Sequence, residues 1–123
     1  MLQGDFYTAS DVNVEGNALK AILNLNVKHK IFDGHFPGHP VVPGVCMMQM
    51  VKDMLELQLL RETRLEKAST MKFLNMINPE VNGTVKIELK QSIAEDGKIN
   101  VDAQLMGEGM VFFKFKGVFH ALS

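Results

Sequence analysis

One histidine stands in a proline-stiffened loop directly before an apolar segment. The loop HFPGHPVVPG (35–44) runs into VCMMQMVKDML (45–55). Proline fixes its own φ angle and restricts the residue before it, so this loop can hold a side chain in one position. An imidazole exchanges protons near neutral pH, which makes His35 a candidate base.

The start of the apolar segment offers a second chemical group. Gly44 and Val45 are expected in the first turn of a helix, where backbone N–H groups lack intrahelical acceptors and the helix dipole is positive. Such donors can stabilise an oxyanion or enolate that develops on a carbonyl. With His35, they predict removal of a proton next to the carbonyl of an apolar substrate. The alternative is a stiff turn in which His35 makes only structural hydrogen bonds.

The elements that position these groups follow from the residue pattern. Helix-forming residues without proline predict a helix from Gly44 to about Leu60. Its first half is apolar nearly all round, so we expect it to be buried. Mostly alternating patterns predict strands at 18–27, 67–77, 84–93, 99–106 and 110–122. This order predicts an α+β fold in which an antiparallel sheet wraps around one long central helix and buries both faces of its first half.

Size and composition narrow the class of protein. The 123 residues predict a single domain, 1–123, and the net charge of −1 gives no basic surface for nucleic acid. No apolar run is long enough to span a bilayer, so no membrane association is expected. The single cysteine, Cys46, excludes an internal disulfide, and the absence of a secretory signal predicts a cytoplasmic protein. Prolines separate His35 from His39, so no metal site is expected.

The segment HFPGHPVVPGV (35–45) resembles the signature of the hotdog-fold 3-hydroxyacyl-[acyl-carrier-protein] dehydratases of the FabZ/FabA type. A later segment, MKFLNMINPEVNG (71–83), resembles a lysine–phenylalanine strand and turn of the same family. The resemblance implies a hotdog fold and a homodimer, a trimer of dimers or a heterodimer with a related chain. The active sites would lie at the subunit interface and use no metal or other cofactor.

The resemblance also assigns roles to residues. His35 would remove the α-proton, and the N–H of Gly44 would hold the carbonyl of a thioester carried by acyl carrier protein or coenzyme A. The acyl chain would lie in an apolar tunnel, with Phe36, Val45 and Met48 as further substrate-binding residues.

One position departs from the family pattern. The family carries a carboxylic acid where this sequence has Gln49, and typically a glutamine where it has Asp53. Residues four apart share a helix face, so Asp53 is a candidate acid one turn further along, while Gln49 would orient the leaving hydroxyl. Structural alternatives are a buried Gln49 amide that ties loop to helix, and an Asp53 that is solvated or paired with Lys52 or Arg61.

The resemblance implies an enzyme that dehydrates 3-hydroxyacyl thioesters to trans-2-enoyl thioesters in fatty-acid or related acyl or polyene synthesis. Two alternatives remain open. The chain could be a non-catalytic or half-competent acyl-thioester-binding subunit of a dehydratase complex, completed by a chain that supplies the acid. It could also be a hotdog thioesterase, although hydrolysis needs no base for an α-proton.

Overall fold

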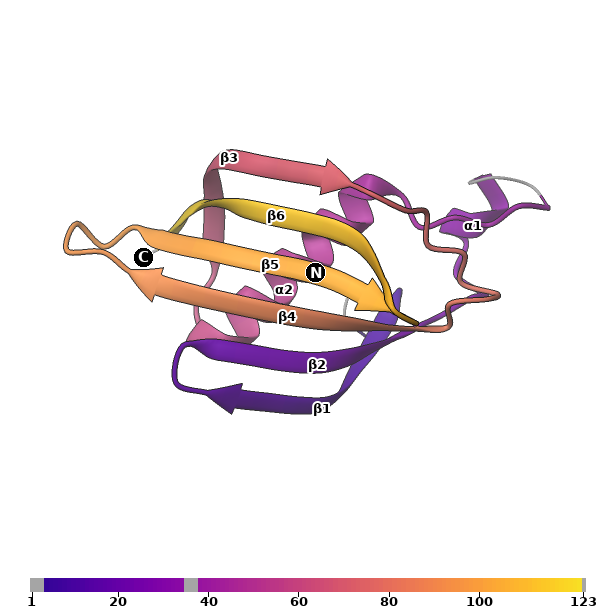
Figure 1. Ribbon diagram of the computed structural model, residues 1–123, viewed down its shortest axis with the longest axis horizontal. Coiled ribbons are helices and arrows are strands. Elements are labelled where there is room, and N and C mark those ends of the chain that lie inside the picture. Colours follow the sequence, from indigo (N-terminus) through magenta and orange to yellow (C-terminus); the bar gives the residue numbers. More distant parts are fainter. Residues whose placement is uncertain (1–3, 35–37, 123) are drawn as a thin grey trace.

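The computed structural model describes residues 4–34 and 38–122, which form one antiparallel sheet and two helices (Figure 1). Across the sheet the strands follow the order β1-β2-β4-β5-β6-β3. The helices are α1 (Ile31–Gly34) and α2 (Gly44–Leu59). The strands are β1 (Tyr7–Glu15), β2 (Ala18–Leu25), β3 (Thr63–Phe73), β4 (Thr84–Ile93), β5 (Ile99–Gly107) and β6 (Met110–Ala121). The predicted α+β architecture is confirmed. No helix in the described ranges is long and apolar enough to cross a membrane.

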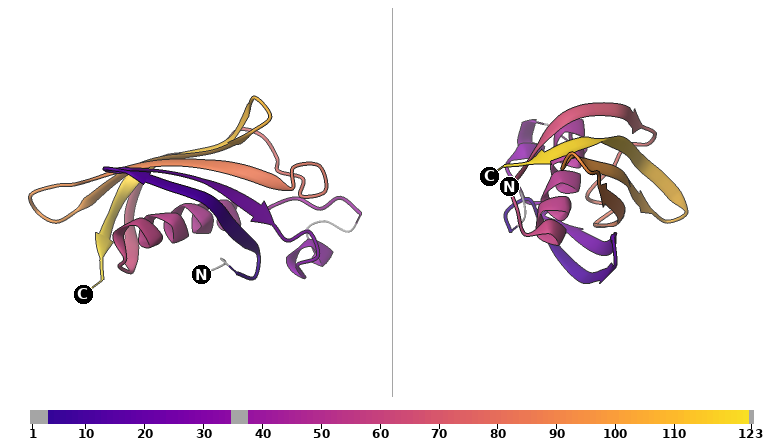
Figure 2. Two further views of the ribbon diagram at one scale, coloured as in Figure 1. Left: turned by 90° about the horizontal axis from the view of Figure 1, so that it is seen from below. Right: turned by 90° about the vertical axis from the view of Figure 1, so that its left-hand side faces the viewer.

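The sheet curves over α2, which lies against its concave face (Figure 2). Alternation along the strands turns one set of apolar side chains towards this helix, such as Leu19, Leu23 and Ile87. The helix contributes the other half of the core, through Cys46, Met47, Met50, Val51, Met54 and Leu55. The helix and sheet therefore form two layers around one core.

The expectation that the first half of α2 is buried on both faces is wrong for the single chain. Val45 is 75% exposed, and Met48 and Gln49 are half-buried. The reason is geometric, because one sheet covers one side of a helix and no other described element covers the side facing away (Figure 2). The residues on that side, which we call the uncovered helix face, are Val45, Met48, Gln49, Lys52 and Glu56.

Gly117 lies at a crowded point of the sheet, where β3 and β6 pair with an irregular register. A Cβ atom at this position would lie 2.4 Å from the Lys67 carbonyl oxygen and 2.6 Å from the Phe115 ring. Backbone cannot move aside as a flexible side chain can. We therefore expect Gly117→Ala to lower the free energy of unfolding by about 1–3 kcal/mol in urea titrations.

Gly34→Ala is the matched control, because a Cβ atom there meets nothing within 4 Å. This variant is expected to unfold at the wild-type urea concentration or slightly above it. Equal stability of the two variants would show that β6 relaxes away from Lys67 at no cost.

Candidate active site

The N-terminus of α2 presents unsatisfied backbone donors. Pro43 precedes the helix in an extended conformation and makes no side-chain capping hydrogen bond. Its carbonyl accepts from the N–H groups of Cys46 and Met47, at 3.0 and 3.2 Å. Gly44 and Val45, as the first two helical residues, have no acceptor within the helix. Neither N–H group donates to another backbone group in the part of the chain that the structure describes, and their role towards a ligand carbonyl stays a prediction.

An apolar groove of about 640 Å³ borders this helix start. The β3 end supplies Phe73, which stacks on Phe113 with ring centroids 4.8 Å apart. A Cβ atom on Gly44 would lie 2.9 Å from the Phe73 ring, so glycine is what allows the helix and ring to approach. The groove is lined by Val41, Val42, Pro43, Gly44, Met47, Phe73, Leu74, Asn75 and Met76. Backbone donors beside an apolar groove suit a ligand with one carbonyl and an aliphatic chain.

Gln49 and Asp53 form one hydrogen-bonded unit with Tyr7. Gln49 Nε2 donates to Asp53 Oδ1 at 2.8 Å, and the Tyr7 hydroxyl donates to Asp53 Oδ2 at 3.0 Å. Asp53 is 0% exposed and Tyr7 is 1% exposed. The interpretation of Asp53 as a solvated helix residue is therefore wrong, and among the described residues the Gln49 amide bonds to its own helix.

The environment of Tyr7 keeps its hydroxyl protonated. Burial raises the pKa of Tyr7 well above its usual value, and the charge of Asp53 and their hydrogen bond raise it further. Tyr7 is thus a permanent donor to the carboxylate at neutral pH. Burial likewise raises the pKa of the Cys46 thiol, which packs in the core as a small apolar residue.

Within one chain, the two ends of the predicted site lie in different hollows. Gly44 lines the apolar groove, whereas Gln49 lines a second hollow of about 620 Å³ towards the end of α2, together with Lys52 and Glu56. Five residues along a helix correspond to a rotation of roughly 140° about its axis, so the two residues face different directions. Met48 packs against the core, and Val45 projects from the uncovered helix face. The predicted residues His35 and Phe36 lie outside the described residues.

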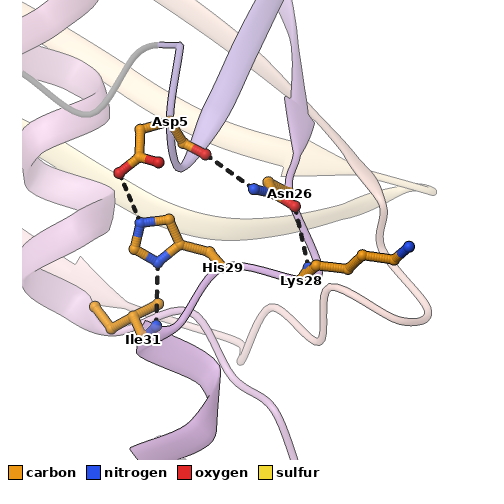
Figure 3. Close-up of polar contacts among 5 residues, drawn as sticks. All are labelled: Asp5, Asn26, Lys28, His29 and Ile31. Atoms are coloured by element: carbon orange, nitrogen blue, oxygen red, sulfur yellow. Dashed lines mark hydrogen bonds and ion pairs between the residues drawn. The ribbon is translucent and has the colours of Figure 1, made fainter.

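A polar cluster holds the segment that leads into the histidine loop (Figure 3). The Ile31 N–H donates to His29 Nδ1 at 3.1 Å, so the ring proton is on Nε2, which donates to Asp5 at 2.9 Å. The Asn26 amide donates to the Asp5 carbonyl. His29 also packs edge-on against Phe6, with ring centroids 5.3 Å apart. The cluster thereby joins the turn before β1 to α1.

Replacing His29 by alanine is expected to lower the free energy of unfolding by about 1–2 kcal/mol, because one hydrogen-bonding ring and its packing are lost. Urea titration measures this change. Lys28→Ala is the control, since Lys28 joins the cluster through its backbone N–H alone. Equal stability of both variants would mean that α1 is held by its core residue Phe32 instead.

Comparison with known proteins identifies the family. The family model for ApeI-like proteins, described as ApeI dehydratase, matches residues 11–110. The chain belongs to the ApeI-like dehydratase family. Curated relatives of this ApeI-like chain include the 3-hydroxyacyl-[acyl-carrier-protein] dehydratase FabZ of Petrotoga mobilis, 26% identical over 81% of the chain and 65% of the relative. FabZ of Ralstonia nicotianae is 28% identical over 80% of this chain and 56% of the relative. The chain thus spans less than two thirds of the length of these relatives.

Solved structures confirm the hotdog fold of the ApeI-like chain. A chain of the dehydratase heterocomplex ApeI:P from Xenorhabdus doucetiae superposes with a TM-score of 0.71 at 17% identity, over 91% of this chain and 96% of that one. A hypothetical thioesterase with coenzyme A from Streptococcus pneumoniae superposes with a TM-score of 0.70 at 7% identity, over 95% of this chain and 86% of that one. At such identities the likeness concerns the fold alone, which different reactions share.

Tyr7 is the functional candidate that the sequence analysis missed. It is the single tyrosine of the chain and begins a strand, which marks it as a core residue. No sequence spacing links position 7 to position 53, because the contact depends on how β1 crosses α2. The sequence holds no signal for this pair, because Asp53 lies in a half of the helix that alternates charged and apolar residues.

Proposed function

We propose that this chain takes part in the dehydration of 3-hydroxyacyl thioesters, carried by acyl carrier protein or coenzyme A, to trans-2-enoyl thioesters. The observation that carries the proposal is the start of α2, where the N–H groups of Gly44 and Val45, which have no acceptor within the helix, border an apolar groove. A thioester carbonyl fits the donors, and an acyl chain fits the groove. Membership of the ApeI-like family supports the same reaction.

The proposed reaction needs three groups. His35 removes the proton from the carbon next to the carbonyl, and the N–H groups of Gly44 and Val45 stabilise the resulting enolate oxygen. The electron pair then forms the carbon–carbon double bond while the bond to the 3-hydroxyl breaks. That hydroxyl leaves as water after receiving a proton from the carboxyl of Asp53, and Gln49 orients it before departure. The proton held by His35 then passes to solvent while Asp53 takes one up, which restores both groups.

We further propose that the working site is shared between two chains. The groove that contains Gly44 does not contain Gln49, which supports a site completed by helix position 49 of a second chain. Two surfaces are suited to this contact: the uncovered helix face around Val45, and the outer edge of β3, which ends the sheet. The second chain would be another copy or a related chain.

The burial of Asp53 favours a specific second candidate, in which a related chain supplies the acid. Asp53 is fully buried and bonded to Tyr7 and Gln49, so delivery of its proton to a substrate would require these contacts to open. In a heterocomplex, such as the one that contains the ApeI-like neighbour, the other subunit would supply the acid. In that case the chain alone binds 3-hydroxyacyl thioesters and turns them over slowly.

The test is hydration of an octenoyl thioester, followed by the loss of enoyl absorbance and, in parallel, by the release of free thiol. Loss of absorbance without free thiol would support the dehydratase. Release of thiol from saturated and enoyl thioesters alike would identify a thioesterase and overturn the proposal. Binding without either change would support the subunit that needs a partner.

A further inference from the structure

Three hydrogen-bonded side chains connect the core of the protein with the hollow at position 49. Tyr7 on β1 and Asp53 on α2 form the buried end, with a distance of 3.0 Å between the hydroxyl and Oδ2. Gln49, half-buried, forms the outer end at 2.8 Å from Oδ1 and lines the hollow. The buried end is fixed by packing, so it can dictate the orientation of the outer end.

The chemistry of the three groups sets the direction of every bond. A carboxylate accepts hydrogen bonds and donates none, so Gln49 must turn its NH₂ group towards Asp53. An amide oxygen in that place would face a negative oxygen and be repelled. The oxygen of Gln49 therefore points away from Asp53, and no described residue donates a hydrogen bond to it. Among the described residues, this oxygen is thus an acceptor without a protein donor.

We propose that Tyr7 and Asp53 are positioning residues that fix Gln49 as a hydrogen-bond acceptor, so that the site selects the 3-hydroxyl group of an acyl thioester over a 3-oxo group. A hydroxyl has a proton to give to the Gln49 oxygen, whereas a ketone oxygen has none and is repelled. The inference rests on the proposed function, since it concerns the same site and names what distinguishes its ligand.

A purely structural role makes a different prediction. If Tyr7 and Asp53 only anchored β1 to α2, their replacement would change stability and leave the choice between ligands as it is. The ligand preference is therefore the quantity to measure, with thermal unfolding beside it.

The experiment compares three unreactive ligands of equal chain length by isothermal titration calorimetry. They are the 3-hydroxyoctanoyl, 3-oxooctanoyl and octanoyl amides of pantetheine, in which nitrogen replaces the thioester sulfur. The amide carbonyl makes the α-proton less acidic, so the 3-hydroxy ligand is not dehydrated during the titration. The wild-type chain is expected to bind the 3-hydroxy ligand about tenfold more tightly than the 3-oxo ligand, the value of one hydrogen bond.

Two variants change the orientation of Gln49 without removing it. Asp53→Asn offers an NH₂ group to the Gln49 oxygen, so the Gln49 amide turns its own NH₂ outwards and the preference is abolished or reversed. Tyr7→Phe removes the donor that holds the carboxylate and is expected to reduce the preference to about threefold or less. Gln49→Met, on the half-buried surface, should bind the three ligands with similar affinity.

Asn24→Ala is the matched control, because Asn24 bonds to Thr8 and Ser10 on the same pair of strands without contacting Asp53. It should keep the wild-type preference. If Tyr7→Phe does not fold, Asp53→Asn and Gln49→Met decide the question. If the ligands bind and Asp53→Asn keeps the wild-type preference, this inference is overturned. The proposed function would then still stand. Failure of the wild-type chain to bind any ligand would overturn both.

Discussion

Exchange of His35 for alanine is expected to lower the rate of enoyl-thioester hydration by about 10²–10⁴-fold, the usual contribution of a general base. The proton on the carbon next to a thioester carbonyl is too weakly acidic to leave without a base, even with the carbonyl oxygen held by Gly44 and Val45. The described residues that line the groove are unchanged in this variant, so we expect KM to stay near the wild-type value while kcat falls. Steady-state rates from enoyl absorbance measure both.

His39→Ala is the matched control, since His39 belongs to the same loop and is exposed. It is expected to keep most of the wild-type rate. If His35→Ala and His39→Ala lose activity equally, the loop acts through its shape and His35 is not the base.

Gln49→Glu is expected to raise the hydration rate of the chain alone by about 10²–10⁴-fold, because it introduces a general acid where the amide can only orient the hydroxyl. The introduced carboxyl would replace the Gln49 amide, whose Nε2 lies 2.8 Å from Asp53 Oδ1. Two carboxylates so close cannot both ionise easily, and the shared proton raises the pKa of the introduced group. The introduced carboxyl therefore keeps its proton to a higher pH than an isolated glutamate would, which suits an acid catalyst.

The same coupling gives Gln49→Glu a distinct pH dependence. The gained activity is present while the introduced carboxyl keeps its proton and is lost as the pH rises through the raised pKa. The unfolded chain releases that proton at a lower pH than the folded chain, so the free energy of unfolding also falls as pH rises. Rate profiles and urea titrations across neutral pH test both. A variant as slow as the wild-type chain at every pH would show that the missing acid is not what limits the reaction.

The main elements of the fold could be read from the sequence. The absence of helix breakers after Gly44 predicts a helix to about Leu60, and α2 ends at Leu59. Alternation predicts 84–93, which is β4, and 99–106, which is one residue shorter than β5. The segment 67–77 is displaced, because β3 spans Thr63–Phe73. Periodicity in β3 is interrupted by two register shifts against β6, and the exposed edge imposes no strict alternation.

The candidate site was less predictable than the fold. The loop motif and the helix start identify Gly44 and Val45, since helix-terminal donors follow from local geometry. The hydrogen bond of Tyr7 with Asp53 cannot be predicted from local geometry. It joins positions 46 residues apart through the tertiary packing of β1 on α2. For the same reason the burial of Asp53 could not be foreseen from a helix half that alternates charged and apolar residues.

The strand order has a consequence for how the chain comes together. β3 follows α2 directly in sequence, yet its one partner in the sheet is β6, with Thr63 opposite Ala121. The three consecutive strands β4, β5 and β6 pair through short turns, so this meander can form early from local contacts. β3 can pair only after β6 has been synthesised, and this pairing closes the long loop of chain between the two strands. The β3 edge of the sheet is therefore completed late in folding, after the meander, because β3 has no strand to pair with until β6 is in place.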